Sequence, residues 1–296
     1  MSHSRLNSRD EAIRSALAAV SSELTPEGNS GWRFAWPNGA PHLVTANTDG
    51  DWLLLEADCP GGTQGSESFC GTLARNACLD GLAKFVLAGD GSLRLRAEIP
   101  VLEGVDPAPR LHETCSGFEA GLTHKRDSSA AEASPGEPEP FDLKRLCSEA
   151  GWPFAERGGR KLAVELEVPG GFSHAVLIPE KRGVRITCEV ATLDAISEEC
   201  RQAVGGFLLA ASGLVRMARA SVNPNGTPSA AQFEVVFGTT PSPLEISSAL
   251  ESLSVCCSLC GEEIRTLQVP AVAERFLALR GWGADAALRR KERTET

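Results

Sequence analysis

The sequence predicts an α+β protein with two similar domains, each an antiparallel sheet with helices on one face. The chain has 296 residues, about twice the usual length of one domain. Several strand-like runs alternate apolar and charged residues, which is typical of antiparallel strands with one buried and one solvated face. The same order of helix-like and strand-like runs occurs twice, on either side of a segment without large apolar residues.

That segment, residues 126–140, reads RDSSAAEASPGEPEP and contains three prolines. It cannot contribute to a hydrophobic core, so it is predicted to be a linker. The predicted organisation is a first domain at residues 1–125, this linker, a second domain at residues 141–287 and a charged tail at residues 288–296.

The composition excludes several classes of function. Acidic residues number 39 against 29 basic ones, a net charge of −10, whereas a surface that binds phosphates is normally basic. We therefore expect no nucleic-acid partner. No apolar run reaches the length of about 18 residues that a membrane span needs, and the first residues form no hydrophobic signal segment. The sequence thus predicts a cytoplasmic protein without membrane insertion.

The first half is predicted to begin with a helix, because Ser8 and Glu11 have capping-box spacing and four apolar residues follow at helical intervals. These residues are Ile13, Leu17, Val20 and Leu24. Strands are then predicted at residues 32–36, 42–48 and 51–58, with turns at Pro37-Asn38-Gly39 and Asp49-Gly50, since Asn-Gly and Asp-Gly favour tight hairpins. A helix at 66–79, a hairpin of strands at 82–87 and 93–99, and a helix at 109–122 complete the half.

The second half is predicted to repeat this order. A helix at 141–150 is followed by strands at 161–168, 173–178 and 183–190. The next helix, at 194–213, is apolar around more than one stripe, so it needs another helix to cover it. A hairpin around Asn223-Pro224-Asn225-Gly226 leads into a strand at 231–237. A long helix and a short one at 271–280 follow.

Ten cysteines raise the alternatives of disulfides or a metal site. A disulfide framework is not expected in a long cytosolic chain. The close set Cys256, Cys257 and Cys260 lacks a second ligand pair at zinc spacing. Two of these cysteines instead belong to an apolar stripe with intervals of three and four, which predicts a buried helix face. The stripe consists of Ile246, Leu250, Leu253, Cys257, Cys260, Ile264 and Leu267. We therefore predict no metal and no cofactor, with metal binding as the lesser alternative.

The segment 73–100, LARNACLDGLAKFVLAGDGSLRLRAEIP, joins a helix end with Leu and Asn, a short strand, a Gly-Asp-Gly turn and an alternating strand that ends in Pro. With the order of elements, it resembles the type III secretion chaperone-like (YbjN-like) family. The second half is similar to a more divergent copy. The resemblance implies a non-enzymatic protein that binds a segment of a client protein. Family members are usually dimers, so two copies in one chain imply a monomeric pseudo-dimer, with a homodimer as the alternative.

The residues themselves offer no candidate for catalysis. None of the five histidines has a Ser or Cys nucleophile in a recognisable context, so we expect no enzyme. The run from Trp52 to Leu55 is apolar on both alternating faces, so one face, Leu53/Leu55 or Trp52/Leu54, should look away from the helices. The partner-binding patch is predicted at Trp52 and Leu54, extended by Trp36 and Val44. The alternative is that this patch is the contact between the halves. The predicted function is a chaperone-like or adaptor module that holds another protein, and the alternative is a structural subunit of a larger complex.

Overall fold

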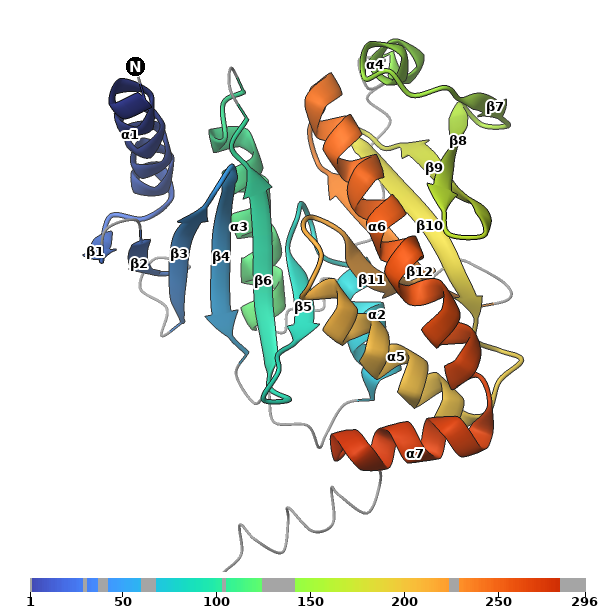
Figure 1. Ribbon diagram of the computed structural model, residues 1–296. Helices are drawn as coiled ribbons and strands as arrows, with labels where there is room; N and C mark the ends of the chain where they lie inside the picture. Colours follow the sequence, from blue (N-terminus) through green and yellow to red (C-terminus); the bar gives the residue numbers. More distant parts are fainter. Residues whose placement is uncertain are drawn as a thin grey trace, which may run out of the picture.

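The computed structural model describes residues 2–28, 31–36, 42–59, 68–102, 105–123, 142–223 and 229–282, with side chains from residue 10 onward. Two six-stranded antiparallel sheets form the framework, and seven helices accompany them in the described residues (Figure 1). This confirms the predicted α+β class. The predicted linker 126–140 and the tail 288–296 lie outside the described residues, as does the turn predicted at Pro37-Asn38-Gly39.

Sheet 1 comes entirely from the first half of the chain. Its strand order is β1-β2-β3-β4-β6-β5. The first four strands form a meander, and a helix lies in the chain between them and the hairpin of β5 and β6. The elements are α1 (Ser2–Val20), β1 (Thr25–Glu27), β2 (Gly31–Ala35), β3 (Leu43–Asp49), β4 (Trp52–Asp58), α2 (Phe69–Ala77), β5 (Lys84–Leu87), β6 (Leu93–Pro100) and α3 (Ala108–Thr123).

Sheet 2 repeats the same topology with the second half, in the order β7-β8-β9-β10-β12-β11. The predicted repetition of elements is therefore present, with one added helix at the end. The elements are α4 (Leu143–Glu149), β7 (Ala155–Arg157), β8 (Lys161–Val168), β9 (Gly171–Pro179), β10 (Val184–Thr192), α5 (Glu198–Ser212), β11 (Arg219–Val222), β12 (Ala230–Phe237), α6 (Pro243–Leu267) and α7 (Pro270–Arg280).

Three details correct the sequence predictions. The outermost strands β1 and β7 were not predicted, because each has three exposed residues and no alternation of apolar and polar side chains. Helix α1 begins at Ser2, so Ser8 lies inside the helix and is not its N-cap. The capping box instead occurs at α6, where the Ser242 hydroxyl accepts from the Glu245 amide and the Glu245 carboxylate accepts from the Ser242 amide.

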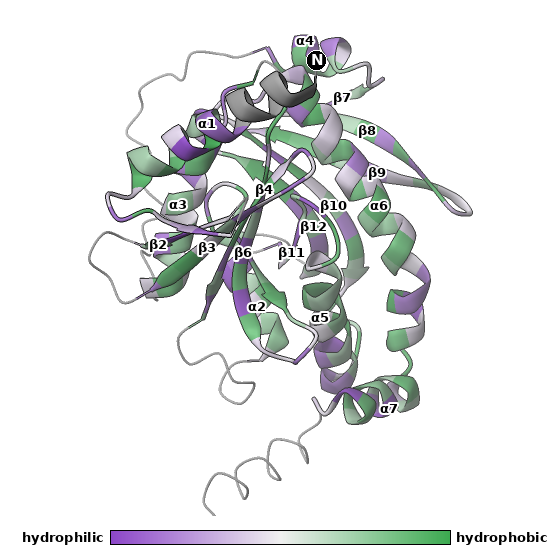
Figure 2. Ribbon diagram, turned by 60° about the vertical axis from the view of Figure 1, so that its left-hand side comes forward, coloured by the Kyte–Doolittle hydropathy of each residue, from purple (hydrophilic) through white to green (hydrophobic). Residues whose placement is uncertain are grey.

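Each sheet is covered on one face by the helix that follows its last strand. Helix α3 packs on sheet 1 and α1 packs on α3, while α6 packs on sheet 2 and α4 packs on α6. All seven residues of the stripe predicted for α6, from Ile246 to Leu267, are buried. The stripe therefore forms the core of the second half, as predicted, and α6 alternates between hydrophobic and hydrophilic residues along its length (Figure 2).

The two halves contact each other through the helices and edge strands at their inner ends. Helix α2 of the first half packs on β11 and on α5, and α5 of the second half packs on β5. Each helix has more contact with the edge strand of the other half than with its own. In Figure 1, α5 accordingly lies between the two sheets. This accounts for the apolar surface that the sequence predicts on more than one side of α5.

Candidate functional site

The first residue of each inner edge strand is a buried cation. In the first half, Lys84 is fully buried and its Nζ lies 2.7 Å from the Glu98 carboxylate on β6. The same Nζ donates to the carbonyl oxygens of Ser212, Val215 and Ala218, at 2.8, 2.7 and 3.1 Å. Those carbonyls belong to the end of α5 and the loop after it. Burial lowers the pKa of the Lys84 ammonium, and the Glu98 charge opposes this shift.

The second half has the corresponding arrangement in the opposite direction. Arg219 is buried, and its Nε donates to Glu234 on β12 at 2.9 Å. Its other nitrogens donate to three carbonyl oxygens in the loop after α2, and burial lowers its pKa. The acceptors are Leu79 at 2.7 Å, Ala83 at 2.9 Å and Gly81 at 3.2 Å. Each half thus supplies a cation to the carbonyl groups that follow the helix of the other half.

Asn76 and Arg110 also join the halves through polar contacts. The side chain of Asn76, in the Leu/Asn-bearing helix end noted in the sequence, donates to the Phe85 and Ala220 carbonyls at 3.2 and 2.8 Å. Arg110 on α3 is buried against Glu245, the capping residue of α6, and lies over the ring of Phe237. These buried charges have partners within the protein and belong to the contact between the halves.

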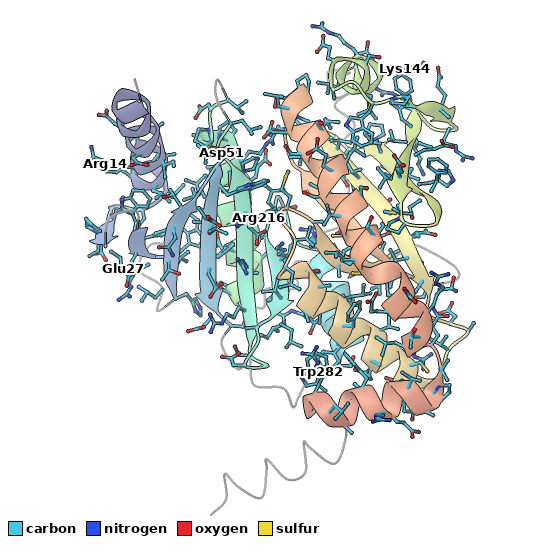
Figure 3. All side chains as sticks on the ribbon, in the orientation of Figure 1. Arg14, Glu27, Asp51, Lys144, Arg216 and Trp282 are labelled. Atoms are coloured by element: carbon cyan, nitrogen blue, oxygen red, sulfur yellow. The ribbon has the colours of Figure 1, made fainter. Side chains whose placement is uncertain are left out.

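Two adjacent glycines in α5 allow close packing at this contact. A Cβ at Gly205 would lie 3.0 Å from the Phe69 Cβ of α2, and one at Gly206 would lie 2.8 Å from the ring of Trp282. Phe69 and Trp282 themselves meet edge to face, with ring centroids 5.2 Å apart. Trp282 follows α7 and lies at its junction with α5 (Figure 3). Phe276 of α7 also contacts Phe207 of α5 edge to face, with ring centroids 6.5 Å apart, so aromatic contacts hold α7 on α5.

The four residues predicted as a partner-binding patch do not share one face of sheet 1. Trp52 and Leu54 are half-buried on the face away from α3, as the alternation of β4 predicts. Val44 is buried in the core, and the Trp36 Nε1 donates to the Cys115 carbonyl of α3, so both lie on the opposite side. The extension of the patch to Trp36 and Val44 is therefore wrong. The register explains it, because Val44 pairs with Ala57 and belongs to the face of Leu53 and Leu55.

The remaining patch touches the second half at one point. The Arg216 guanidinium, in the loop after α5, lies 5.8 Å from the centre of the Trp52 ring and forms an ion pair with Asp49. Arg216 lies between the two halves in Figure 3. Part of the Trp52 surface is thus a contact between the halves, which was the alternative interpretation of this patch.

A groove lies along α6, between α5, α7 and the turn at residues 87–91 of the first half. It consists of two hollows of about 460 and 440 Å³ that share Phe207 and Glu263. Their walls include the partly buried rings of Phe276 and Trp282. Three leucines around the groove are strongly exposed: Leu214 at 84%, Leu279 at 78% and Leu259 at 55%. This collection of exposed leucines at a hollow is the feature of the described surface that best fits binding of another chain.

Charged groups stand at the border of this groove. Glu262 and Glu263 are exposed neighbours on α6. On the α7 side, the Arg280 guanidinium lies over the rings of Phe276 and Trp282 at 5.6 and 5.7 Å. The α6 side of the groove is therefore acidic, whereas the α7 side, with Arg275 and Arg280, is basic.

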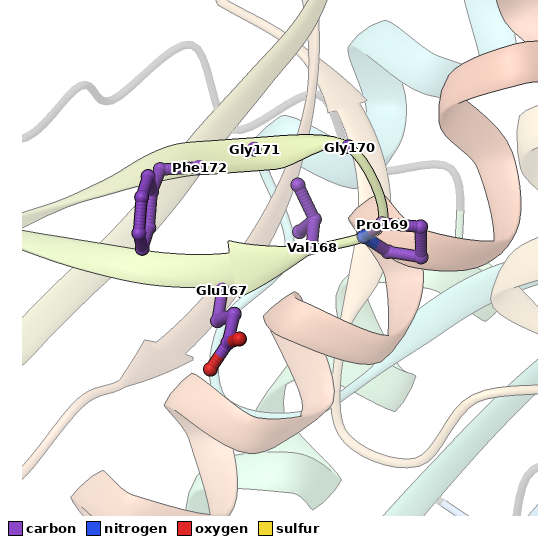
Figure 4. Close-up of a pocket in the computed structure, with 6 residues that line it drawn as sticks. All are labelled: Glu167, Val168, Pro169, Gly170, Gly171 and Phe172. Atoms are coloured by element: carbon purple, nitrogen blue, oxygen red, sulfur yellow. The ribbon is translucent and has the colours of Figure 1, made fainter.

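A third hollow, of about 550 Å³, lies at the turn between β8 and β9 (Figure 4). It is lined by residues 167–172, which include the Pro169-Gly170-Gly171 turn. It brings together no set of functional side chains. Within the residues that the structure describes, no group of three or more His, Cys, Asp or Glu side chains is placed to hold a metal ion.

The sequence interpretation missed the groove because it followed only the inward stripe of α6. Val255 and Leu259 are one turn apart, lie between the residues of that stripe and are exposed. Apolar residues on the otherwise polar side of an amphipathic helix were the available signal. The hollows themselves depend on how α7 folds back onto α5, which no local pattern indicates.

Helix α6 has features in common with a membrane span. It is the one helix of the described chain long and apolar enough by length and composition, and half of its most apolar window is buried inside the protein. Burial of the α6 stripe against sheet 2 is the pattern of a core helix.

Comparison with known proteins gave no match to a family model, to a curated protein or to a solved structure. The resemblance to the chaperone-like family thus stays a prediction, and function has to be argued from the groove itself.

Proposed function

We propose that the protein is a non-enzymatic, chaperone-like or adaptor module of the cytoplasm that holds a helical segment of another protein in the groove between α5, α6 and α7. The observation that carries this proposal is the pair of adjoining hollows surrounded by exposed leucines. Apolar surface of this kind is costly to leave in water, so its burial by a partner is favourable. The resemblance to the chaperone-like family supports the same class of function.

The chemistry of the groove favours an amphipathic helix with an aliphatic stripe and with Lys or Arg residues on the side that faces α6. Helices bind such grooves through apolar anchors at positions i, i+3 or i+4, and i+7. The two hollows adjoin at Phe207, so they suit successive anchors of one helix. Glu262 and Glu263 then favour basic residues beside the stripe, because opposite charges at the rim of an interface increase association and specificity.

The contact between the halves supports this proposal by holding the walls of the groove in place. We propose that the halves form an intramolecular pseudo-dimer, in which Lys84 and Arg219 fix the loops after α5 and α2. Leu214 belongs to the loop that Lys84 holds through the carbonyls of Val215 and Ala218. A wall positioned in this way loses less entropy on binding than a mobile one.

The test uses the full chain and two fluorescent helical peptides of identical length. Both carry leucines at i, i+4 and i+7, one with flanking lysines and the other with flanking glutamates. We expect fluorescence anisotropy to show binding of the lysine peptide, at least tenfold weaker binding of the glutamate peptide, and loss of the preference in Glu262→Gln/Glu263→Gln.

Leu259→Asp should abolish binding of the lysine peptide. Val255→Asp is the matched control, because Val255 is an exposed aliphatic residue of the same helix that does not line either hollow. Equal binding to Leu259→Asp and wild type would contradict the proposed site. Failure of both peptides to bind would contradict the proposed function.

The alternative of a structural subunit makes a different prediction. A permanent partner should remain bound in a fixed ratio when the protein is purified from its host, as measured by size-exclusion chromatography with light scattering. Exchangeable binding of peptides to the isolated chain favours the adaptor instead.

A further inference from the structure

Two buried cysteines of the second half face each other across its core. The sulfur of Cys188 on β10 lies 3.1 Å from the sulfur of Cys257 on α6. Cys188 is 1% exposed and Cys257 is 7% exposed. Neither residue lies in the groove or in the contact between the halves. A disulfide bond is about 2.0 Å long, so a shift of roughly 1 Å would bring the two sulfurs to bonding distance.

The surroundings of the pair shift the pKa values of the two thiols in opposite directions. Cys257 has a lowered pKa, because the Cys188 thiol and the Ser173 hydroxyl hydrogen-bond to its sulfur. The pKa of Cys188 is raised by the same thiol–thiol hydrogen bond and by burial. One thiol therefore more readily becomes the nucleophilic thiolate, while its neighbour keeps a proton. Ser173 is half-buried, so a side chain that contacts solvent lies beside the Cys257 sulfur.

We infer that Cys188 and Cys257 are a site of oxidative modification, which closes to an intramolecular disulfide when the protein meets a peroxide. In the first step the Cys257 thiolate attacks a peroxide oxygen, the O–O bond breaks, and a sulfenic acid and a hydroxide form. In the second step the Cys188 sulfur attacks the Cys257 sulfur, the S–O bond breaks, and the departing hydroxide takes the Cys188 proton. Two thiols and one hydrogen peroxide thus give one disulfide and two waters.

The disulfide would join β10 to α6 and close a long stretch of chain that includes α5. Crosslinks over long loops restrict the unfolded chain most, so the oxidised second half should resist unfolding more than the reduced one. Cys256 provides the matched comparison. It is also buried on α6, next to Cys257 in the chain, but among the described residues its sulfur makes no hydrogen bond to another sulfur, and Lys84 is its charged neighbour.

The experiment treats the full chain with hydrogen peroxide, blocks remaining thiols by alkylation and maps linked peptides by mass spectrometry. We expect a peptide that joins residues 188 and 257, its loss after reduction with dithiothreitol, and a urea midpoint that is higher for oxidised than for reduced protein. Cys256→Ser should keep the linked peptide and the midpoint shift, whereas Cys188→Ser and Cys257→Ser should lack both.

Two results would overturn the inference, and both can be obtained with the wild-type chain alone. One is oxidation of the exposed Cys78 without any link between residues 188 and 257. The other is links from Cys188 to Cys256 or Cys260 in yields equal to the link to Cys257, since random oxidation would not follow the observed pairing.

Discussion

The two halves of the molecule share one topology but carry different side chains at some equivalent positions. At the inner edge strand the halves agree, because Lys84 with Glu98 and Arg219 with Glu234 are both buried ion pairs that reach into the other half. On the neighbouring central strand they differ. Register places Trp52 and Leu54 of β4 where β10 has Arg185 and Thr187.

The contact between the halves and the outward faces of the sheets therefore constrain the sequence differently. A cation that is buried where the halves meet needs a charged partner, and both halves have such an ion pair. The outward face of the central strand has no such requirement. Arg185 there pairs with Glu234, at 2.7 Å, whereas Trp52 receives Arg216 over its ring. The second half also adds α7, and the groove exists where α7 folds back onto α5 and α6.

The largest expected effect comes from breaking one of the buried ion pairs. Lys84→Met leaves the buried Glu98 with Arg96 as its charged partner and leaves three carbonyl groups of the second half without their donor, so it should destabilise the protein by about 3–5 kcal/mol in urea unfolding. Arg219→Met should cost a similar amount if the two halves are equivalent at this position. Lys84→Met/Glu98→Leu should recover much of the loss, because it removes both charges.

Lys144→Met is the control for this comparison, since the Lys144–Glu156 pair is exposed on α4 and β7. Its effect should stay within about 0.5 kcal/mol. A loss for Lys84→Met no larger than that of Lys144→Met would show that the contact between the halves does not depend on the buried cation.

The next effect tests whether α5 needs its glycines for the contact. Gly206→Val places methyl groups against the Trp282 and Phe69 rings and should cost about 1–3 kcal/mol through overpacking. Gly261→Ala in α6 is the matched control, because nothing lies within 4 Å of the added Cβ. It should stabilise the protein by up to about 1 kcal/mol, as Ala favours helix. Both values follow from thermal or urea unfolding, and equal effects of the two changes would contradict the packing argument.

Much of the fold was predictable because period-two runs and helical stripes are local. The alternation of residues 161–168 coincides with β8, and the stripe with Cys257 and Cys260 is the buried face of α6. The edge strands β1 and β7 were missed, because strands of three exposed residues have no hydrophobic pattern. Strand formation there depends on pairing with β2 and β8 and not on the local sequence.

The candidate site was less predictable than the fold. Sequence correctly placed Trp52 and Leu54 on one face, but the register of β3 against β4 placed Val44 on the other. A lysine at the start of a strand, such as Lys84, is normally solvated. Lys84 is buried because α5 and the loop after it pack against its ammonium group. Contacts between distant segments, such as Phe207 with α7, have no signal in a single sequence.

A smaller effect concerns the outward faces of the two central strands. Trp52→Ala removes the contact with Arg216 and should cost about 1 kcal/mol, because a cation over an exposed ring contributes about 0.5–1 kcal/mol and some apolar area is lost as well. Thr187→Ala on β10 changes no ring contact and serves as the comparison. A loss of several kcal/mol for Trp52→Ala in urea unfolding would show that Trp52 is core.

The smallest effect decides between the two interpretations of the Trp52 surface. In a double-mutant cycle of Trp52→Ala with Arg216→Gln, the coupling energy measures their contact without the other losses of each change. If the surface is a contact between the halves, we expect a coupling of about 0.5 kcal/mol. The ion pair of Arg216 with Asp49 is partly exposed, so its own contribution should fall as salt is added while the coupling to the ring persists. A coupling indistinguishable from zero in urea unfolding at low and high salt would mean that Arg216 does not hold Trp52, which leaves that face of sheet 1 open to a partner protein.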